Sequence, residues 1–178
     1  MGLTYIASVT ASASATVEFT TGIDATYNEY QFHFVNMHAA TDNVHYGFQV
    51  NAAGQSGFNE TMTTTVFRAY NREGVPDSGL DYRTPLDQAQ GTAYQTLASY
   101  QGADADQSAS GILTLYDPSS TTYVKHFTAT TQYSLEGEYS INMYAAGYIN
   151  TTAAIDEISF KFASGNIDAG SIHMYGVG

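Results

Sequence analysis

The sequence contains no cysteine and no tryptophan, and only 12% of its 178 residues are charged. Without cysteine, a disulfide framework, a thiolate nucleophile and a cysteine-ligated zinc site are all excluded. Five Lys and Arg residues stand against 17 Asp and Glu residues, which gives a formal net charge of −12. Nucleic-acid binding requires clustered basic residues, and anionic membranes attract them, so we expect neither partner.

Long apolar runs are also missing from the sequence. No stretch approaches the ~18 consecutive apolar residues that a membrane-spanning helix needs. Residues 11–15 (ASASA) have the small side chains of a signal-peptide cleavage site. No Lys or Arg precedes them, and Ser and Thr interrupt the apolar region, so we predict no signal peptide. The expected protein is a soluble, acidic, single domain over residues 1–178.

Aromatic and β-branched residues are abundant, with 15 Tyr, 9 Phe and many Thr. Short alternating stretches are separated by Gly, Asn, Asp and Ser, which favours strands over helices. We predict an all-β fold of about nine antiparallel strands, arranged as a sandwich or a flattened barrel. Thr84 and Pro85 fit an N-cap and a first helical position, so at most a short helical turn is expected near 85–90 and ends by Gly91.

Two hairpins are predicted from the alternation of large side chains. Segments 30–37 and 44–50 each bear aromatic residues on one face, and a short loop near 39–41 would join them. The register that pairs these faces sets Phe34 opposite Tyr46, Phe32 opposite Phe48 and Tyr30 opposite Val50. The second hairpin joins 158–162 to 172–174, with Lys161 and His173 facing each other on its outer side.

No catalytic or cofactor-binding constellation is recognisable in the sequence, so we expect no enzyme, no cofactor and no metal site. The 17 acids permit a glycosidase-like carboxylate pair, but solvated loop acids are the simpler interpretation. His33 and His45 would lie diagonally across one face of the first hairpin, roughly 7–8 Å apart, which is wide for a shared metal. Asp104 and Asp106 fit the start of a calcium loop or a polar turn.

The tyrosines are the most suggestive functional feature. Tyrosine combines a large apolar face with a hydroxyl group, so it is enriched at protein interfaces. Cross-strand ladders are the simplest interpretation of 15 tyrosines; contact with another subunit or with a glycan is the alternative. The opposite face of segment 30–37 is mixed, because it includes Val35 and Met37, and this composition suggests a partner or a covering loop.

Five stretches resemble small virion structural proteins of tailed bacteriophages, of the head-decoration or tail-fibre-like type known from marine and cyanobacterial hosts. They cover most of the chain, and they read FTTGIDATYNEYQFHFVNMH (19–38), SGILTLYDPSSTTYVKHF (110–127), AGYINTTAAIDEISFKF (146–162), SGNIDAG (164–170) and IHMYGV (172–177). The resemblance implies a jelly-roll-like sandwich on the surface of a virion, made in the host cytoplasm. It carries over no catalytic residues.

The resemblance also implies partners: other virion proteins, namely the major capsid protein or a tail protein, and further copies of the chain, with a trimer favoured. We expect a capsid decoration or cement protein, because no collagen-like or coiled-coil shaft is present. A tail-fibre or adhesin domain that binds host-surface carbohydrate is the alternative. Segments 71–83 and 132–139 lie outside the resemblance and would hold variable recognition. The candidate contact residues are Val35, Met37, Tyr82, Arg83, Tyr133 and Tyr139.

Overall fold

Alternation of buried and exposed side chains organises the chain into 13 strands and one 3₁₀ turn in the computed structural model, which describes residues 2–178. Their bounds are β1 (Leu3–Ser14), β2 (Val17–Phe19), β3 (Glu29–Ala39), β4 (Val44–Ala52), β5 (Met62–Arg72), β6 (Ser78–Tyr82), η1 (Thr84–Leu86), β7 (Ala89–Gly91), β8 (Gln95–Gln101), β9 (Ala109–Tyr116), β10 (Lys125–Leu135), β11 (Tyr139–Ile149), β12 (Ile155–Phe162) and β13 (Ile167–Val177). The prediction of an all-β antiparallel fold is confirmed, and the predicted count of about nine strands is wrong.

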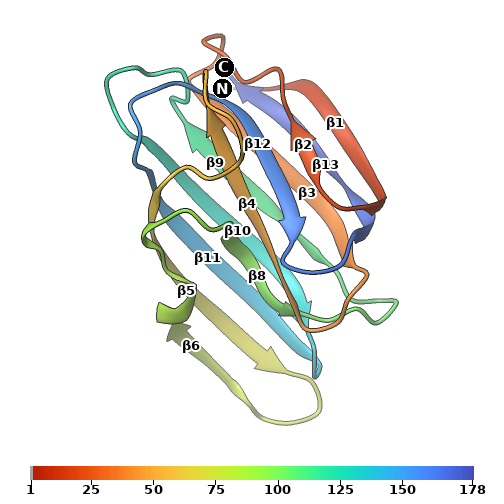
Figure 1. The fold of residues 1–178 in the computed structure, drawn as a ribbon. Helices are drawn as coiled ribbons and strands as arrows, with labels where there is room; N and C mark the ends of the chain where they lie inside the picture. Colours follow the sequence, from red (N-terminus) through yellow and green to blue (C-terminus); the bar gives the residue numbers. More distant parts are fainter. Residues whose placement is uncertain (1) are drawn as a thin grey trace.

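All 13 strands belong to one antiparallel sheet that folds back on itself. One stretch of the sheet runs in the order β1-β13-β3-β9-β10-β11-β5, with β6 and β7 both on the far edge of β5. A second stretch, β8-β4-β12-β2, joins the first where β10 pairs with β8 through Leu135 and Gln101. In Figure 1 this second stretch passes in front of β3, β9 and β10. The edge strands β1 and β2 approach each other, so the sheet is nearly closed.

The core lies between the two stretches of the sheet and is largely aromatic. Phe32 of β3 packs against Phe160 of β12 with ring centroids 5.8 Å apart, and Phe48 of β4 packs against Phe127 of β10 at 5.0 Å. All four side chains are buried. Edge-to-face and tilted ring pairs of this kind add to the stabilisation that burial of the apolar area provides.

Both predicted hairpins are wrong, because each pair of strands is divided between the two stretches of the sheet. β3 pairs with β13 and β9, whereas β4 pairs with β12 and β8. Phe34 still meets Tyr46, but across the core, with ring centroids 5.6 Å apart. β12 pairs with β4 and β2, and β13 pairs with β1 and β3. Two aromatic faces that pack against each other across a core are both buried. If the two strands were paired in a hairpin, their aromatic faces would form one surface, and another element would have to pack on it.

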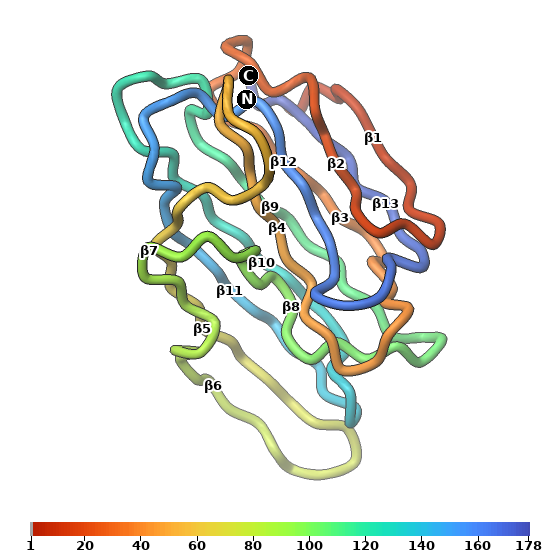
Figure 2. The backbone as a smooth tube through the Cα atoms, in the orientation of Figure 1, coloured from red at the N-terminus to blue at the C-terminus, as the bar shows by residue number. Residues whose placement is uncertain are grey.

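Consecutive strands do pair elsewhere in the chain. β10 and β11 form a long hairpin from Lys125 opposite Ile149 to Leu135 opposite Tyr139. β5 and β6 form a second one, which makes the lower end of the molecule in Figure 2. The predicted short helical turn is confirmed as the 3₁₀ turn η1, but the chain is extended again at β7, well before the expected end.

Candidate functional site

Three aromatic side chains form a row across the outer face of the sheet. Phe67 of β5 lies opposite Tyr82 of β6 on one side and opposite Tyr144 of β11 on the other. The rings of Phe67 and Tyr144 are stacked, with centroids 4.9 Å apart and planes 10° from parallel. Their exposed fractions are 57% for Tyr82, 43% for Phe67 and 38% for Tyr144. We call Tyr82, Phe67 and Tyr144 the aromatic row.

Hydrogen bonds hold the outer end of the aromatic row in place. The Tyr82 hydroxyl donates to Asp87 Oδ2 at 2.5 Å, and Asp87 Oδ1 accepts from the backbone N–H of Val66 at 2.8 Å. The bond to the carboxylate raises the pKa of the Tyr82 phenol, because the carboxylate stabilises the protonated donor. Tyr82 is therefore fixed to the turn that follows β6, and its ring lies beside Phe67.

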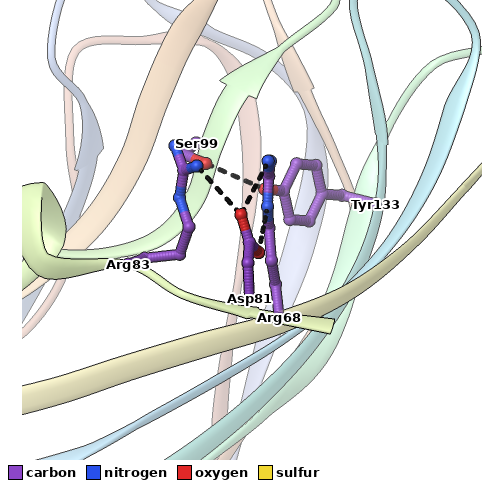
Figure 3. Close-up of polar contacts among 5 residues, drawn as sticks. All are labelled: Arg68, Asp81, Arg83, Ser99 and Tyr133. Carbon is purple, nitrogen blue, oxygen red and sulfur yellow. Dashed lines mark hydrogen bonds and ion pairs between the residues drawn. The ribbon is translucent and has the colours of Figure 1, made fainter. Parts of the chain in front are cut away.

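An ion-pair cluster on the other face of the same strands holds β6 against β5. Asp81 Oδ1 lies 3.0 Å from Arg68 Nε, and Asp81 Oδ2 lies 3.3 Å from Arg83 Nη1 (Figure 3). Partial burial acts to raise the pKa of Asp81, but the two guanidinium groups outweigh it and lower the pKa. Two of the five basic residues of the chain are thus committed to positioning the strand that carries Tyr82.

A line of small side chains runs beside the aromatic row. Thr65 of β5, two residues before Phe67, lies opposite Ala146 of β11, two residues after Tyr144. Ala146 also lies opposite Thr128 of β10, and Thr128 lies opposite Thr114 of β9. We call Thr65, Ala146, Thr128 and Thr114 the floor. The Thr128 hydroxyl lies 3.1 Å from the Tyr116 hydroxyl, and one donates to the other. Because these side chains are short, the floor lies lower than the aromatic row.

A second line of rings borders the floor on its other side. Tyr148 of β11 lies opposite His126 of β10, with ring centroids 6.3 Å apart. Tyr144 and Tyr148 are four residues apart on one strand, so the two walls stand about 13 Å apart at a strand rise of about 3.2–3.4 Å per residue. The aromatic row, the floor and the pair Tyr148 and His126 together form a channel across the strands, which we call the outer groove.

Three hollows adjoin at the floor of the outer groove. Their volumes are about 430 Å³ between β9 and β10, about 400 Å³ beside Tyr148 and about 170 Å³ beside Phe67, and Thr128 lines all three. Within residues 2–178, the side chains that line these hollows include no Asp, Glu, Lys or Arg. This is notable because the chain has 17 acidic residues. The groove offers rings, hydroxyl groups and amides to a ligand.

The predicted contact residues are separated by the fold. Met37 and Tyr133 are 0% and 2% exposed, so the prediction that Met37 shares an outer face with Val35 is wrong. The backbone of Asn36 is left-handed, with φ +53°, and the pairing with β9 shifts register between Phe34 and Met37, which turns Met37 inward. Val35 remains 42% exposed.

The other predicted contact residues lie near one end of the sheet. Tyr82 belongs to the aromatic row, Arg83 is part of the ion-pair cluster, and Tyr133 shares a hydrogen bond with Ser99 inside the fold (Figure 3). Tyr139 donates a hydrogen bond to Asp77 Oδ2 at 2.6 Å, and Arg72 lies over its ring. Bonding to that carboxylate raises the pKa of Tyr139.

The structure changes the predicted neighbours of the histidines and shows a turn at Asp104. His33 lies opposite His173 rather than diagonal to His45, and the His45 ring packs edge-on against Tyr100 at 4.7 Å. Lys161 lies over the Tyr94 ring at 4.3 Å, so the predicted pairing of Lys161 with His173 is wrong. Asp104 forms a turn in which its carbonyl oxygen accepts from the N–H of Gln107 at 2.8 Å. Across residues 2–178 the structure contains no group of three or more His, Asp or Glu side chains placed to hold a metal ion.

Of the residues that form the outer groove, only Tyr82 was among the contact residues predicted from the sequence. Thr63 and Thr65, and again Thr128 and Thr130, alternate along their strands in the sequence, which marks one face of each strand. That signal does not reveal that β11 lies between β5 and β10 and brings Ala146 and Tyr144 into the same face.

No protein-family model, no curated protein and no solved structure matches this chain. In residues 2–178 the structure contains no helix long and apolar enough to cross a membrane.

Proposed function

We propose that the protein is a non-enzymatic structural protein on the surface of a bacteriophage particle, where it acts as a capsid decoration or cement protein with a jelly-roll-like sandwich fold. The observation that carries this proposal is the outer face of the sheet from β3 to β6. This face exposes large apolar side chains, among them Val35, Ile112, Leu80 and the aromatic row. The three rings of the aromatic row are cross-strand neighbours and form a contiguous exposed apolar area, which on a soluble domain is typical of an interaction surface. The resemblance of five stretches to virion proteins supports the particle as the setting.

The distribution of charge suits such a contact. The outward-facing positions of β9, β10 and β11 hold Thr, Ser, Gln, Asn, Tyr, His, Ile and Ala, whereas most acidic residues lie in the connecting loops. A contact through uncharged groups depends little on ionic strength. The acidic loops give the remaining surface a strong negative charge, which keeps particles and copies of the chain from associating through other faces. The partners we propose are the major capsid protein or a tail protein, and two further copies in a trimer.

The outer groove favours a second candidate function: a tail-fibre or adhesin domain that binds host-surface carbohydrate. A sugar has both apolar ring faces and hydroxyl groups. Exposed aromatic rings pack against the apolar faces, and neighbouring hydroxyl side chains form hydrogen bonds with the sugar hydroxyls. In this case the protein would lie at the end of the tail rather than over the head.

Imaging of the protein on intact virions tests both candidates. The chain contains no cysteine, so Gln55→Cys in the exposed turn after β4 gives a single attachment site for a gold label. We expect a regular pattern of label over the head. Label confined to the tail end would replace the decoration role by the adhesin role, and particles without label would overturn the proposed function. Wild-type virions treated with the same reagent are the matched control.

A further inference from the structure

We propose that the outer groove is a binding site for a neutral glycan chain, which lies across strands β5, β11, β10 and β9. This inference rests on the second candidate of the proposed function, the adhesin domain, because the outer groove is open to a host-surface glycan only where this face does not lie against another virion protein. It goes further in assigning a site, a class of ligand and a direction of binding.

The dimensions of the outer groove fit an extended polymer. Its walls stand about 13 Å apart, and neighbouring strands are about 4.8 Å apart, so the four strands β5, β11, β10 and β9 give it a length of at least about 14 Å. The hollows beside Tyr148 and beside Phe67 both span β5, β11 and β10, and the third spans β10 and β9, so the three hollows that adjoin at Thr128 cover all four strands. A single sugar would leave most of this length empty, whereas a chain of several sugars fills it.

The chemistry of the walls and the floor fits a carbohydrate. The stacked rings of Phe67 and Tyr144 present a broad apolar edge to the hollow beside them, and Tyr148 lines the adjoining hollow on the other side of the floor. Thr65 and Thr128 provide hydroxyl groups on the floor, and Gln132 lines the third hollow. Apolar walls fix the faces of the sugar rings, and hydroxyl and amide groups exchange hydrogen bonds with the sugar hydroxyls.

Charge restricts the ligand to neutral sugars. Within residues 2–178, no Lys or Arg lines the three hollows, so a uronic acid, sialic acid or sulfate group would find no guanidinium or ammonium partner there. The net charge of −12 would also repel an anionic polymer. His126 is the one histidine among the side chains that line the three hollows, and it stands at the rim beside Tyr148.

A second copy of the chain fits the outer groove less well than a glycan does. Two identical faces would meet groove to groove, and each lacks the ridge that would fill the floor of the other. A narrow polymer with hydroxyl groups on its edges and apolar ring faces fills the floor and reaches both walls.

The test measures binding of the purified full-length protein to an immobilised panel of neutral glucans, mannans and galactans, with heparin and polysialic acid as anionic comparisons. We expect the protein to bind a neutral polysaccharide. This binding should not weaken when the NaCl concentration is raised from about 0.05 to about 0.5 M, a range over which ionic contacts become screened. Ala146→Arg should abolish binding, because it fills the floor between the walls. Tyr144→Ala should weaken binding about tenfold or more, which corresponds to about 1.4 kcal/mol.

Tyr5→Ala is the matched control, because Tyr5 is a 58% exposed tyrosine on β1, which is separated from β9 by β13 and β3 in the sheet. Circular dichroism and thermal unfolding show whether each variant is folded, and Tyr144→Ala tests the site if Ala146→Arg does not fold. Absence of binding to every neutral glycan, binding only to the anionic polymers, or equal binding by wild type and both groove variants would each overturn the inference. A regular label over the virion head with no glycan binding would overturn this inference and leave the proposed function standing.

Discussion

The hydroxyl groups of Tyr133 and Ser99 lie 3.0 Å apart in the interior of the fold, where one donates a hydrogen bond to the other (Figure 3). Tyr46 is buried just as completely, but its hydroxyl has no hydrogen-bond partner among residues 2–178. Burial raises the pKa of the Tyr46 phenol well above its usual range. The two tyrosines therefore have the same burial and opposite hydrogen-bonding status, which makes them a matched pair.

Tyr133→Phe should lower the free energy of unfolding by about 1–3 kcal/mol, because the Ser99 hydroxyl would lose its partner in a buried place. Tyr46→Phe should leave the free energy of unfolding unchanged or raise it by up to about 1 kcal/mol, because it removes a buried group that has no partner. Urea unfolding followed by tyrosine fluorescence and circular dichroism measures both. A larger loss in Tyr46→Phe than in Tyr133→Phe would contradict the hydrogen-bond assignment.

Gly111→Ala should destabilise the protein by about 2 kcal/mol or more, because overpacking a tight core forces backbone and side chains to move. A Cβ atom at Gly111 would lie 2.7 Å from Cζ of Phe34 and would also contact the backbone oxygen of Thr130. Gly2→Ala is the control, since a Cβ atom there would meet nothing within 4 Å. Thermal unfolding of the two variants checks the expectation, and an unchanged melting temperature in Gly111→Ala would show that β9 and β3 have room to separate.

The alternation of side chains was sufficient to predict the strands and their buried faces, but not their neighbours. Phe32, Phe34, Tyr46 and Phe48 are all buried, as the pattern of segments 30–37 and 44–50 predicts. A period of two marks the face that is buried and does not distinguish a neighbour in the same sheet from a neighbour across the core. The four-residue connection between β3 and β4 allows either arrangement, and the choice depends on β9, β12 and β13, which are distant in the sequence.

The candidate site was less accessible from the sequence than the fold. Tyr82 was predicted as a contact residue and is 57% exposed, but its neighbours Phe67 and Tyr144 are 15 and 62 residues away in the sequence, and only the pairing of β6, β5 and β11 brings them together. Met37 was misplaced because one left-handed residue, Asn36, changes the side on which the following side chains lie. Local patterns record neither a distant register nor a bulge.

Asp81→Asn should loosen β6 while leaving the rest of the sheet intact. The carboxylate is shared by Arg68 and Arg83, and without its charge two partly buried guanidinium groups would repel each other. The Asp81 side chain is 37% exposed, so solvent screens the pair and we expect a loss of only about 1 kcal/mol. Limited proteolysis should cut the loop at residues 73–77 faster than in wild type, and hydrogen exchange in β6 should increase. Asp106→Asn, at an exposed turn, is the control, and equal cleavage of both variants would contradict the proposed role of the cluster.

The free energy of unfolding should fall as the pH drops below about 6.5, in part because of His45. Burial lowers the pKa of His45, and the positive charge of Arg83 lowers it further. The unfolded chain, in which histidine has a pKa of about 6.5, therefore takes up a proton before the folded chain does. This contribution to stability is complete above pH 6.5 and is lost as the pH falls toward the lower pKa of the folded state.

The comparison of wild type with His45→Gln isolates this contribution. Urea unfolding at intervals from about pH 5 to pH 8 should give a smaller loss of stability for His45→Gln, because glutamine does not titrate in this range. His33→Gln should act in the same direction, since burial lowers the pKa of His33 and the charge of His173 adds to the effect. A pH dependence in His45→Gln equal to that of wild type would show that the His45 ring is not desolvated in the folded protein, contrary to its packing against Tyr100.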